Sequence, residues 1–311
     1  MSREASLGVV VNARAGAVRK DPALVERLRA RLPDGALALT ASLADVEPAL
    51  CALRDRGVET LVVIGGDGSV GGTLTALLAC WPEAALPALV LAPGGTVNTI
   101  ARSLGARGKP ERLVERLLAG APPRIETRRP LVRARSEAGA SRAGMIFANG
   151  VAVRWLEMYY ARPRQGVLGA TAVVGRIAGS ALARGPLARR LFEPLRCEIA
   201  VDGQALDVER LTVSAASSVR HIGLGFRPFA SAGTDPERFH FAVTGAGAGR
   251  ILAALPALRL GRSAAALRHF SARRVAMRFE TPEPWTIDAD LFPPTRALEL
   301  TASAPLRFLV P

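Results

Sequence analysis

The most informative stretch of the sequence is the glycine-rich segment VVIGGDGSVGG at 62–72. Apolar residues typical of a buried strand end there in glycines that carry one carboxylate and one hydroxyl. A strand followed by a glycine turn and a helix can bind anions, because backbone N–H groups are exposed and no Cβ atoms keep phosphate oxygens away. The residues predicted to bind phosphate in this way are Gly65, Gly66, Asp67, Gly68, Ser69 and Gly72.

Asp67 is the unusual member of this turn, because a carboxylate repels phosphate unless a cation lies between them. Mg²⁺ is the usual cation in phosphoryl transfer, and one or two carboxylates hold it together with substrate phosphates. The turn therefore predicts a Mg²⁺ ligand at Asp67. The alternative interpretation is an ordinary strand-to-helix turn in which Asp67 is only a cap.

A second turn, in LAPGGTVNTIARSLG at 91–105, repeats this arrangement of strand, glycines and helix. Thr96 has an alternative explanation as the N-cap of the helix. Two such turns at the carboxyl ends of neighbouring parallel strands would form one crevice, where open α/β sheets bind ligands. The residues expected to line it are Gly94, Gly95, Thr96 and Asn98, with Asn12 and Thr40 at the ends of two further predicted strands.

The elements that would position these turns alternate along the first 120 residues. Strands are predicted at 7–12, 36–40, 59–66 and 88–95, and helices at 21–32, 44–57 and 71–81, the first of them with Asp21 as N-cap. This alternation indicates βαβ units and a parallel sheet. After 121–130 the pattern changes to short extended runs at near-regular spacing, which favour a mainly antiparallel β domain.

We therefore predict an α/β protein whose open parallel-sheet, nucleotide-binding domain precedes a second, mainly antiparallel β domain. The first domain is expected to span 1–128 and to be joined by the tail 302–311. The second is expected to span 129–301.

The combination of motifs resembles the diacylglycerol kinase catalytic family, which includes bacterial lipid kinases, sphingosine kinases and ceramide kinases. The resemblance rests on Asn12 in the first turn, on GGDGS at 65–69 and on PGGTVNTIARSLG at 93–105, and it is thinner afterwards. It implies ATP and Mg²⁺ as cofactors, the glycine turns and Asn12, Thr40, Thr96 and Asn98 at the nucleotide, and a catalytic role for Asp67.

The resemblance also implies a proton acceptor in the segment IDADLF at 287–292. The family's Asp-Gly-Glu aligns with Asp288, Ala289 and Asp290, so Ala289 replaces a glycine and Asp290 is one methylene shorter than glutamate. We expect Asp288 to be the base, with Asp290 as the second candidate, since either carboxylate can do this work if it reaches the hydroxyl. Asp235 is the remnant of the family's second Mg²⁺ site, but the usual glycine beside it is missing.

The charge balance favours anionic partners, since 41 basic residues against 27 acidic ones give a net charge of +14. The arginine-rich segments 162–192 and 250–270 are interpreted either as solvated helix faces or as a surface that contacts an anionic membrane. Nucleic-acid binding is not expected, because aromatic residues make up only 5% and do not alternate with basic runs. The three cysteines form no CxxC pair, which indicates reduced thiols and a cytoplasmic protein.

The predicted function is ATP-dependent phosphorylation of a primary hydroxyl on a membrane lipid such as diacylglycerol, ceramide or a sphingoid base. The protein is expected to associate peripherally with the membrane through the arginine-rich segments 162–192 and 250–270. No stretch reads as a membrane span or as a signal peptide. Two alternatives stay open. One is a soluble kinase similar to NAD kinases, which share a GGDG turn, and the other is a nucleotide-binding or lipid-binding protein without transferase activity.

Overall fold

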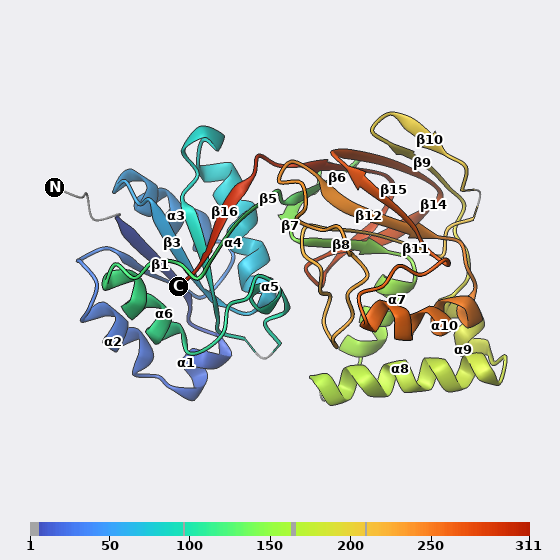
Figure 1. The fold of residues 1–311 in the computed structure, drawn as a ribbon, viewed down its shortest axis with the longest axis horizontal. Coiled ribbons are helices and arrows are strands. Elements are labelled where there is room, and N and C mark those ends of the chain that lie inside the picture. The colour runs from blue at the N-terminus through green and yellow to red at the C-terminus, as the bar shows by residue number, and fades with distance from the viewer. Residues whose placement is uncertain (1–5, 96, 163–165, 209) are drawn as a thin grey trace. The chain divides into compact units, whose positions relative to one another are not determined.

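The computed structural model describes residues 6–311 except 96, 163–165 and 209, and the chain divides into two compact units. One unit consists of residues up to Arg129 together with Ala304–Pro311, and the other of Pro130–Ser303. Figure 1 shows the strands and helices of each unit.

The N-terminal unit is built on a six-stranded, mostly parallel sheet with the strand order β2-β1-β3-β4-β16-β5. Only β5 runs antiparallel, against β16. The strands are β1 (Leu7–Asn12), β2 (Leu37–Thr40), β3 (Thr60–Gly65), β4 (Ala88–Pro93), β5 (Ile125–Arg129) and β16 (Leu306–Val310). The helices are α1 (Gly16–Lys20), α2 (Leu24–Arg29), α3 (Val46–Asp55), α4 (Asp67–Cys80), α5 (Thr99–Ser103) and α6 (Pro110–Leu118), with a 3-10 turn at Glu83–Ala85.

Helices cover both faces of this sheet, which explains why its central strands are apolar without interruption. Every residue of β3 is buried. On one face Val62 and Val90 pack against Leu28 of α2 and Val114 of α6. On the other, α3 packs against α4, and the sheet ends at its carboxyl edge in the predicted glycine turns.

The C-terminal unit contains a ten-stranded antiparallel sheet in the order β13-β12-β11-β8-β14-β15-β6-β7, with β9 paired to β14 and β10 to β9. Its strands are β6 (Val132–Ser136), β7 (Ser141–Gly144), β8 (Ile146–Asn149), β9 (Cys197–Val201), β10 (Gln204–Leu206), β11 (Val213–Ser217), β12 (Phe239–Thr244), β13 (Arg268–Ala272), β14 (Arg274–Ile287) and β15 (Asp290–Ala302). The helices are α7 (Val151–Tyr160), α8 (Val167–Leu182), α9 (Pro186–Leu191) and α10 (Ala248–Arg259).

Alternation along the strands gives this sheet one apolar and one polar face. In β14, Val275, Met277 and Phe279 are buried, whereas Arg274 and Arg278 are exposed. The buried face forms one core with Phe147, Phe241 and Trp285 among its largest members. The predicted fold class, a mostly parallel α/β sheet together with a larger antiparallel sheet, is confirmed.

The hairpin between β14 and β15 has a tight two-residue turn at Asp288 and Ala289. Ile287 pairs with Asp290 across the turn, and both turn residues have positive φ angles, 48° for Asp288 and 73° for Ala289. Turns of this kind favour Asn or Asp followed by glycine, because a Cβ atom is unfavourable in the left-handed region. Ala289 therefore holds a strained backbone conformation that a glycine would adopt freely.

We expect Ala289→Gly to raise the free energy of unfolding of the C-terminal unit by about 0.5–1 kcal/mol, because relief of the left-handed strain exceeds the added entropy of the unfolded chain. Denaturant unfolding monitored by circular dichroism measures this change. The matched control is Ala253→Gly at an exposed position inside α10, which should lower stability by about 1 kcal/mol. Destabilisation by both substitutions would contradict the strain at Ala289.

Candidate functional site

The two predicted glycine turns of the N-terminal unit lie against each other, backbone to backbone. The N–H of Gly94 donates to the carbonyl oxygen of Gly65 at 2.9 Å. A Cβ atom placed on Gly95 would lie 2.5 Å from the Cα of Gly66, and one on Gly94 would lie 2.8 Å from the nitrogen of Gly65. Real Cβ atoms do not approach backbone this closely, so any side chain here would force the turns apart. The glycines are thus required for the contact between the two turns.

Asp67 joins the two turns through its carboxylate. It is the first residue of α4, and its Oδ2 and Oδ1 accept the N–H groups of Thr99 and Ile100, each at 3.0 Å. Asp67 therefore does act as a helix cap. The helix that it caps is not α4, which it begins, but α5, which begins in the other turn. Each carboxylate oxygen has a further lone pair, so the cap leaves acceptor capacity for a metal ion.

The polar side chains predicted to line the crevice also hold the turns in place. Asn12 donates from Nδ2 to the Oγ of Ser69, which connects β1 to α4. The Asn98 side chain accepts from the N–H of Gly95 at 2.6 Å and donates to its carbonyl oxygen at 2.8 Å, while the Asn98 backbone is left-handed with φ 55°. Asn12, Ser69, Asn98 and the turn glycines are therefore brought together at the carboxyl edge of the sheet.

The other predicted nucleotide residues occupy different settings. Thr40 is buried at the end of β2, and its Oγ1 donates to the carbonyl oxygen of Val11 at 3.3 Å. Gly72 is buried inside α4, whereas Gly68 is exposed in its first turn. Thr96 lies outside the described residues. Thr40 thus ties the end of β2 to β1, whereas Gly72 lies in the buried part of α4 and Gly68 lies at the surface of its first turn.

The first turn of α4 is suited to an anion. The first N–H groups of a helix have no partner within the helix, and the helix dipole adds a partial positive charge there. Asp67, Gly68 and Ser69 supply these N–H groups, and the Ser69 hydroxyl lies beside them. Such an arrangement can hold phosphate oxygens, with Asp67 placed to share a cation with them.

The surroundings of the predicted metal ligands differ. Within the described part of the chain no cluster of three or more Asp, Glu, His or Cys side chains is arranged to hold a metal. The two amide contacts of Asp67 leave lone pairs on its carboxylate oxygens, which fits a cation held jointly with phosphate and water. Asp235 has an arginine partner instead, since its Oδ2 lies 3.7 Å from Nε of Arg238, whose Nη1 also contacts Asp202 at 2.8 Å. The guanidinium already supplies the positive charge there, so the residues around Asp235 do not fit the second Mg²⁺.

The two candidate bases lie in the β14–β15 hairpin and have different environments. Asp288 is buried, with 4% of its surface exposed, and its carboxylate accepts the N–H groups of Met145 at 3.0 Å and Ile146 at 2.9 Å. A Cβ atom on Gly144 would lie within 2.8 Å of this carboxylate, so the glycine permits the close approach. Through these hydrogen bonds Asp288 links the hairpin to the β7–β8 connection.

Asp290 is the more accessible carboxylate, with 42% of its side chain exposed. Burial of part of the group raises the pKa of the Asp290 carboxyl above its ordinary value, and the neighbouring Arg142 guanidinium acts in the opposite direction. Nη2 of Arg142 donates to Oδ2 of Asp290 at 3.0 Å. A partly exposed carboxylate with a raised pKa has the properties of a general base.

Two residues that contact this hairpin were not predicted from the sequence. Arg142 on β7 holds Asp290, and the hydroxyl of Tyr160 on α7 donates to the carbonyl oxygen of Ala289 at 2.8 Å. Both lie more than 120 residues from the hairpin in the chain, and neither belongs to a motif. Only the antiparallel pairing of the strands brings Arg142 near the turn, so no local signal identified these residues.

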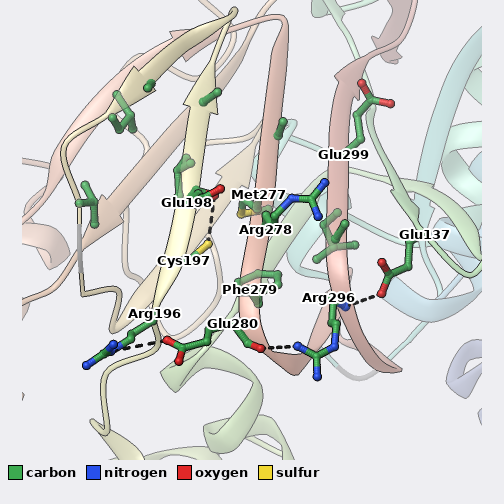
Figure 2. Close-up of a pocket in the computed structure, with 18 of the residues that line it drawn as sticks. Glu137, Arg196, Cys197, Glu198, Met277, Arg278, Phe279, Glu280, Arg296 and Glu299 are labelled. Carbon is green, nitrogen blue, oxygen red and sulfur yellow. Dashed lines mark hydrogen bonds and ion pairs between the residues drawn. The ribbon is translucent and has the colours of Figure 1, made fainter.

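A cavity of about 1700 Å³ opens elsewhere, on the polar face of the C-terminal sheet. Alanines of four strands, Ala200, Ala205, Ala276 and Ala297, form its floor, and charged residues surround them. Figure 2 shows contacts among them: Nε of Arg196 lies 3.6 Å from the Glu280 carboxylate, the Arg296 guanidinium donates to the backbone carbonyl oxygen of Glu280, and the Glu137 carboxylate accepts the backbone N–H of Arg296 at 2.8 Å. None of the predicted site residues lines this cavity, so it is separate from the candidate site.

Comparison with known proteins agrees with these motifs. Residues 6–129 match the family described as the diacylglycerol kinase catalytic domain. A solved structure of a diacylglycerol kinase from Bacillus anthracis str. Sterne has a TM-score of 0.64 and 16% identity, covering 99% of this chain and 97% of the other. A second structure from that organism, provisionally assigned as a diacylglycerol kinase, has a TM-score of 0.69 and 17% identity, covering 99% and 95%.

No curated protein matches the chain in sequence. The likeness to the solved structures extends over both units and establishes the fold, while the family match covers the N-terminal unit that carries the glycine turns. Residues 6–129 are therefore similar to the diacylglycerol kinase catalytic domain.

Proposed function

We propose that the protein is an ATP-dependent lipid kinase, which transfers the γ-phosphate to a primary hydroxyl of a membrane lipid such as diacylglycerol, ceramide or a sphingoid base. The observation that carries this proposal is the joining of the two glycine turns by Asp67 in a unit similar to the diacylglycerol kinase catalytic domain. This arrangement gathers helix N–H groups, a hydroxyl and a carboxylate at one sheet edge, as phosphoryl transfer requires.

In this proposal the N–H groups at the start of α4 bind the phosphates of ATP, and Asn12, Ser69 and Asn98 keep the two turns at the required spacing. Asp67 would hold Mg²⁺ together with phosphate oxygens and water, and the ion neutralises the charge of the triphosphate. Asp67 keeps both of its amide contacts in this role, because a carboxylate has about four lone-pair sites.

Asp290 is the proton acceptor that the contacts of the hairpin favour, in place of our first expectation, Asp288. The lipid hydroxyl gives its proton to Asp290 as its oxygen bonds to the γ-phosphorus, and the bond from that phosphorus to the β–γ bridging oxygen breaks to release ADP. Asp288 is less suited, because it is buried and its carboxylate already accepts two backbone N–H groups. Arg142 holds Asp290 in one orientation.

Membrane association is part of the proposal. The arginine-rich segments 162–192 and 250–270 fall largely on α8, α9 and α10, and basic residues are attracted to anionic lipid. No helix among the described residues is long and apolar enough to cross a bilayer. The three cysteines are free, which agrees with the proposed cytoplasmic location. Peripheral contact would let the enzyme reach a lipid that stays in the membrane.

A second candidate function is a nucleotide-binding or lipid-binding protein without transferase activity. The observation that favours it is the altered hairpin, in which Ala289 replaces glycine and the Asp288 carboxylate is already bonded to backbone. A soluble kinase of the NAD-kinase type is the third alternative. The three candidate functions are distinguished by whether a phosphorylated product forms and by what that product is.

Incubation with γ-labelled ATP, Mg²⁺ and a total lipid extract should yield labelled phospholipid, which chromatography and mass spectrometry identify. Omission of Mg²⁺ should abolish the label. Binding of ATP without any labelled lipid would favour the second candidate. In a parallel incubation with NAD in place of the lipid extract, labelled NADP would favour the third.

Asp67→Asn should lower turnover at least about 100-fold, because the loss of one negative charge weakens the hold on Mg²⁺ at the phosphates. It should also lower the free energy of unfolding by about 1–2 kcal/mol, since one amide of α5 loses its charged acceptor. Lipid phosphorylation and denaturant unfolding measure the two effects.

The matched control is Asp202→Asn. Asp202 likewise accepts two backbone N–H groups, from Arg273 at 3.0 Å and Arg274 at 2.8 Å, but it lies in the β9–β10 turn. Its substitution should cost similar stability and leave turnover within about threefold of wild type. Equal activity losses in the two variants would refute a specific role for Asp67.

Asp290→Asn should lower kcat by about 10²–10⁴-fold while the protein stays folded, because general-base catalysis contributes a factor of this size. Asp288→Asn should mainly lower stability, since its carboxylate is a buried acceptor of backbone N–H groups. A folded but inactive Asp288 variant beside an active Asp290 variant would reverse the assignment.

The pH dependence offers a further check on the same base. The acid limb of kcat/KM should lie above the ordinary pKa of aspartate, because the pKa of Asp290 is raised and the base must be ionised. Arg142→Met removes the charge that opposes this rise, so the limb should move to higher pH. A limb that stays in place would show that Asp290 does not titrate in the reaction.

A further inference from the structure

Helix α8 has an unusual composition for a helix at the surface of its unit. Its 16 residues, VLGATAVVGRIAGSAL, include one charged side chain, Arg176. Surface helices normally carry polar residues on the side away from the core. The residues of α8 that are exposed are instead mostly small or apolar: Thr171, Ala172, Gly175, Arg176, Gly179 and Leu182.

The opposite side of α8 is apolar and packs against other helices of the same unit. Val173 and Ile177 are buried against Trp155 of α7, Leu191 of α9 and Ile251 of α10. Figure 1 shows α8 beyond α7 and α10 at the margin of the C-terminal unit. The exposed residues therefore form an outward face, which ends at Leu182 with 86% of its surface exposed.

The segment of the chain that contains α8 carries charge of one sign. Residues 158–192 include no aspartate or glutamate, and they contain six arginines: Arg162, Arg164, Arg176, Arg184, Arg189 and Arg190. Residues 210–234 and 238–279, the latter of which contains α10, are also free of acidic residues. Among the described residues, Arg176 and Arg190 have no ion-pair partner. The helix and its flanks therefore combine apolar surface with uncompensated positive charge.

This combination matches the surface of an anionic bilayer. Helices that lie in the membrane interface place an apolar face at the boundary between head groups and acyl chains, while basic residues pair with lipid phosphates. The length of α8 excludes a spanning role, since 16 residues at 1.5 Å each give about 24 Å, less than the roughly 30 Å of a hydrocarbon core.

We propose that α8 is an interfacial helix whose outward face lies on an anionic phospholipid bilayer, with Leu182 inserted among the head groups and Arg176 paired with lipid phosphate. The inference deepens the proposed lipid kinase function, because it names the element that brings the enzyme to its substrate. It assigns the contact to one face of one helix within the arginine-rich segment.

Other occupants of this face fit less well. A second copy in a two-fold dimer would bring the same arginines against each other, because such an interface is self-complementary. Nucleic acid offers negative charge but no apolar environment for Leu182, and the outward face carries no aromatic side chain on which bases could stack.

Co-sedimentation with phosphatidylcholine vesicles, alone or mixed with phosphatidylglycerol, tests the proposal without ATP or turnover. The wild-type protein should bind only the anionic vesicles, and binding should weaken as salt is raised. Leu182→Glu and Arg176→Glu should each lower the partition coefficient about tenfold or more. Circular dichroism confirms that the variants are folded.

The matched control is Leu43→Glu, which changes a leucine that is 60% exposed in the N-terminal unit and should leave vesicle binding unchanged. Leu182→Glu should also retain wild-type turnover of a short-chain, water-dispersed lipid substrate while losing turnover of the same lipid in vesicles. Equal loss on both substrates would overturn the docking role, as would equal binding to neutral vesicles or unchanged binding by Leu182→Glu.

Two further outcomes would also overturn the proposal. One is a wild-type dimer in sedimentation equilibrium that Leu182→Glu converts to monomer, and the other is binding to duplex DNA that falls in this variant while vesicle binding does not. Failure of the lipid kinase function is a separate result, because a protein that binds anionic vesicles through α8 yet labels no lipid would refute the enzyme assignment alone.

Discussion

The close approach of two backbone turns is the constraint on which the candidate nucleotide site depends. Gly66 and Gly95 meet without side chains, and Asp67 ties the start of α4 to the start of α5. Hydrogen bonds to a charged acceptor each contribute about 1.5–3 kcal/mol, enough to hold two short segments in one geometry. Asp67 therefore has a structural role in holding the two turns together, and the same carboxylate is the one available to a cation.

Much of the N-terminal unit follows from local sequence, because buried parallel strands and glycine exits leave strong patterns. The strands at β1, β3 and β4 and the meeting of the two turns agree with the analysis of motifs. The predicted helix at 21–32 was wrong in its start and extent: α2 spans Leu24–Arg29, and Asp21 forms an ion pair with Arg27 instead of capping a helix. Local capping rules gave the wrong start because a charged side chain competed for the carboxylate.

The candidate site in the C-terminal unit was harder to predict, because its contacts are distant in the chain. The segment IDADLF offers two carboxylates, and sequence alone favours neither. The left-handed turn buries Asp288 against amides that Gly144 leaves accessible, and it leaves Asp290 beside Arg142. Strand pairing over more than 140 residues decides which carboxylate is exposed. The family match, confined to residues 6–129, adds no information about this hairpin.

Strand β16 has a consequence for how the protein is made. It lies between β4 and β5, and its Phe308 and Leu306 are fully or almost fully buried, although the rest of the N-terminal sheet precedes residue 130. On the ribosome the N-terminal unit thus emerges without β16, and this strand follows about 180 residues later, roughly 10–40 s at ordinary translation rates. Exposed strand edges invite aggregation, and the facing edges of β4 and β5 have no partner in the nascent chain until β16 is synthesised.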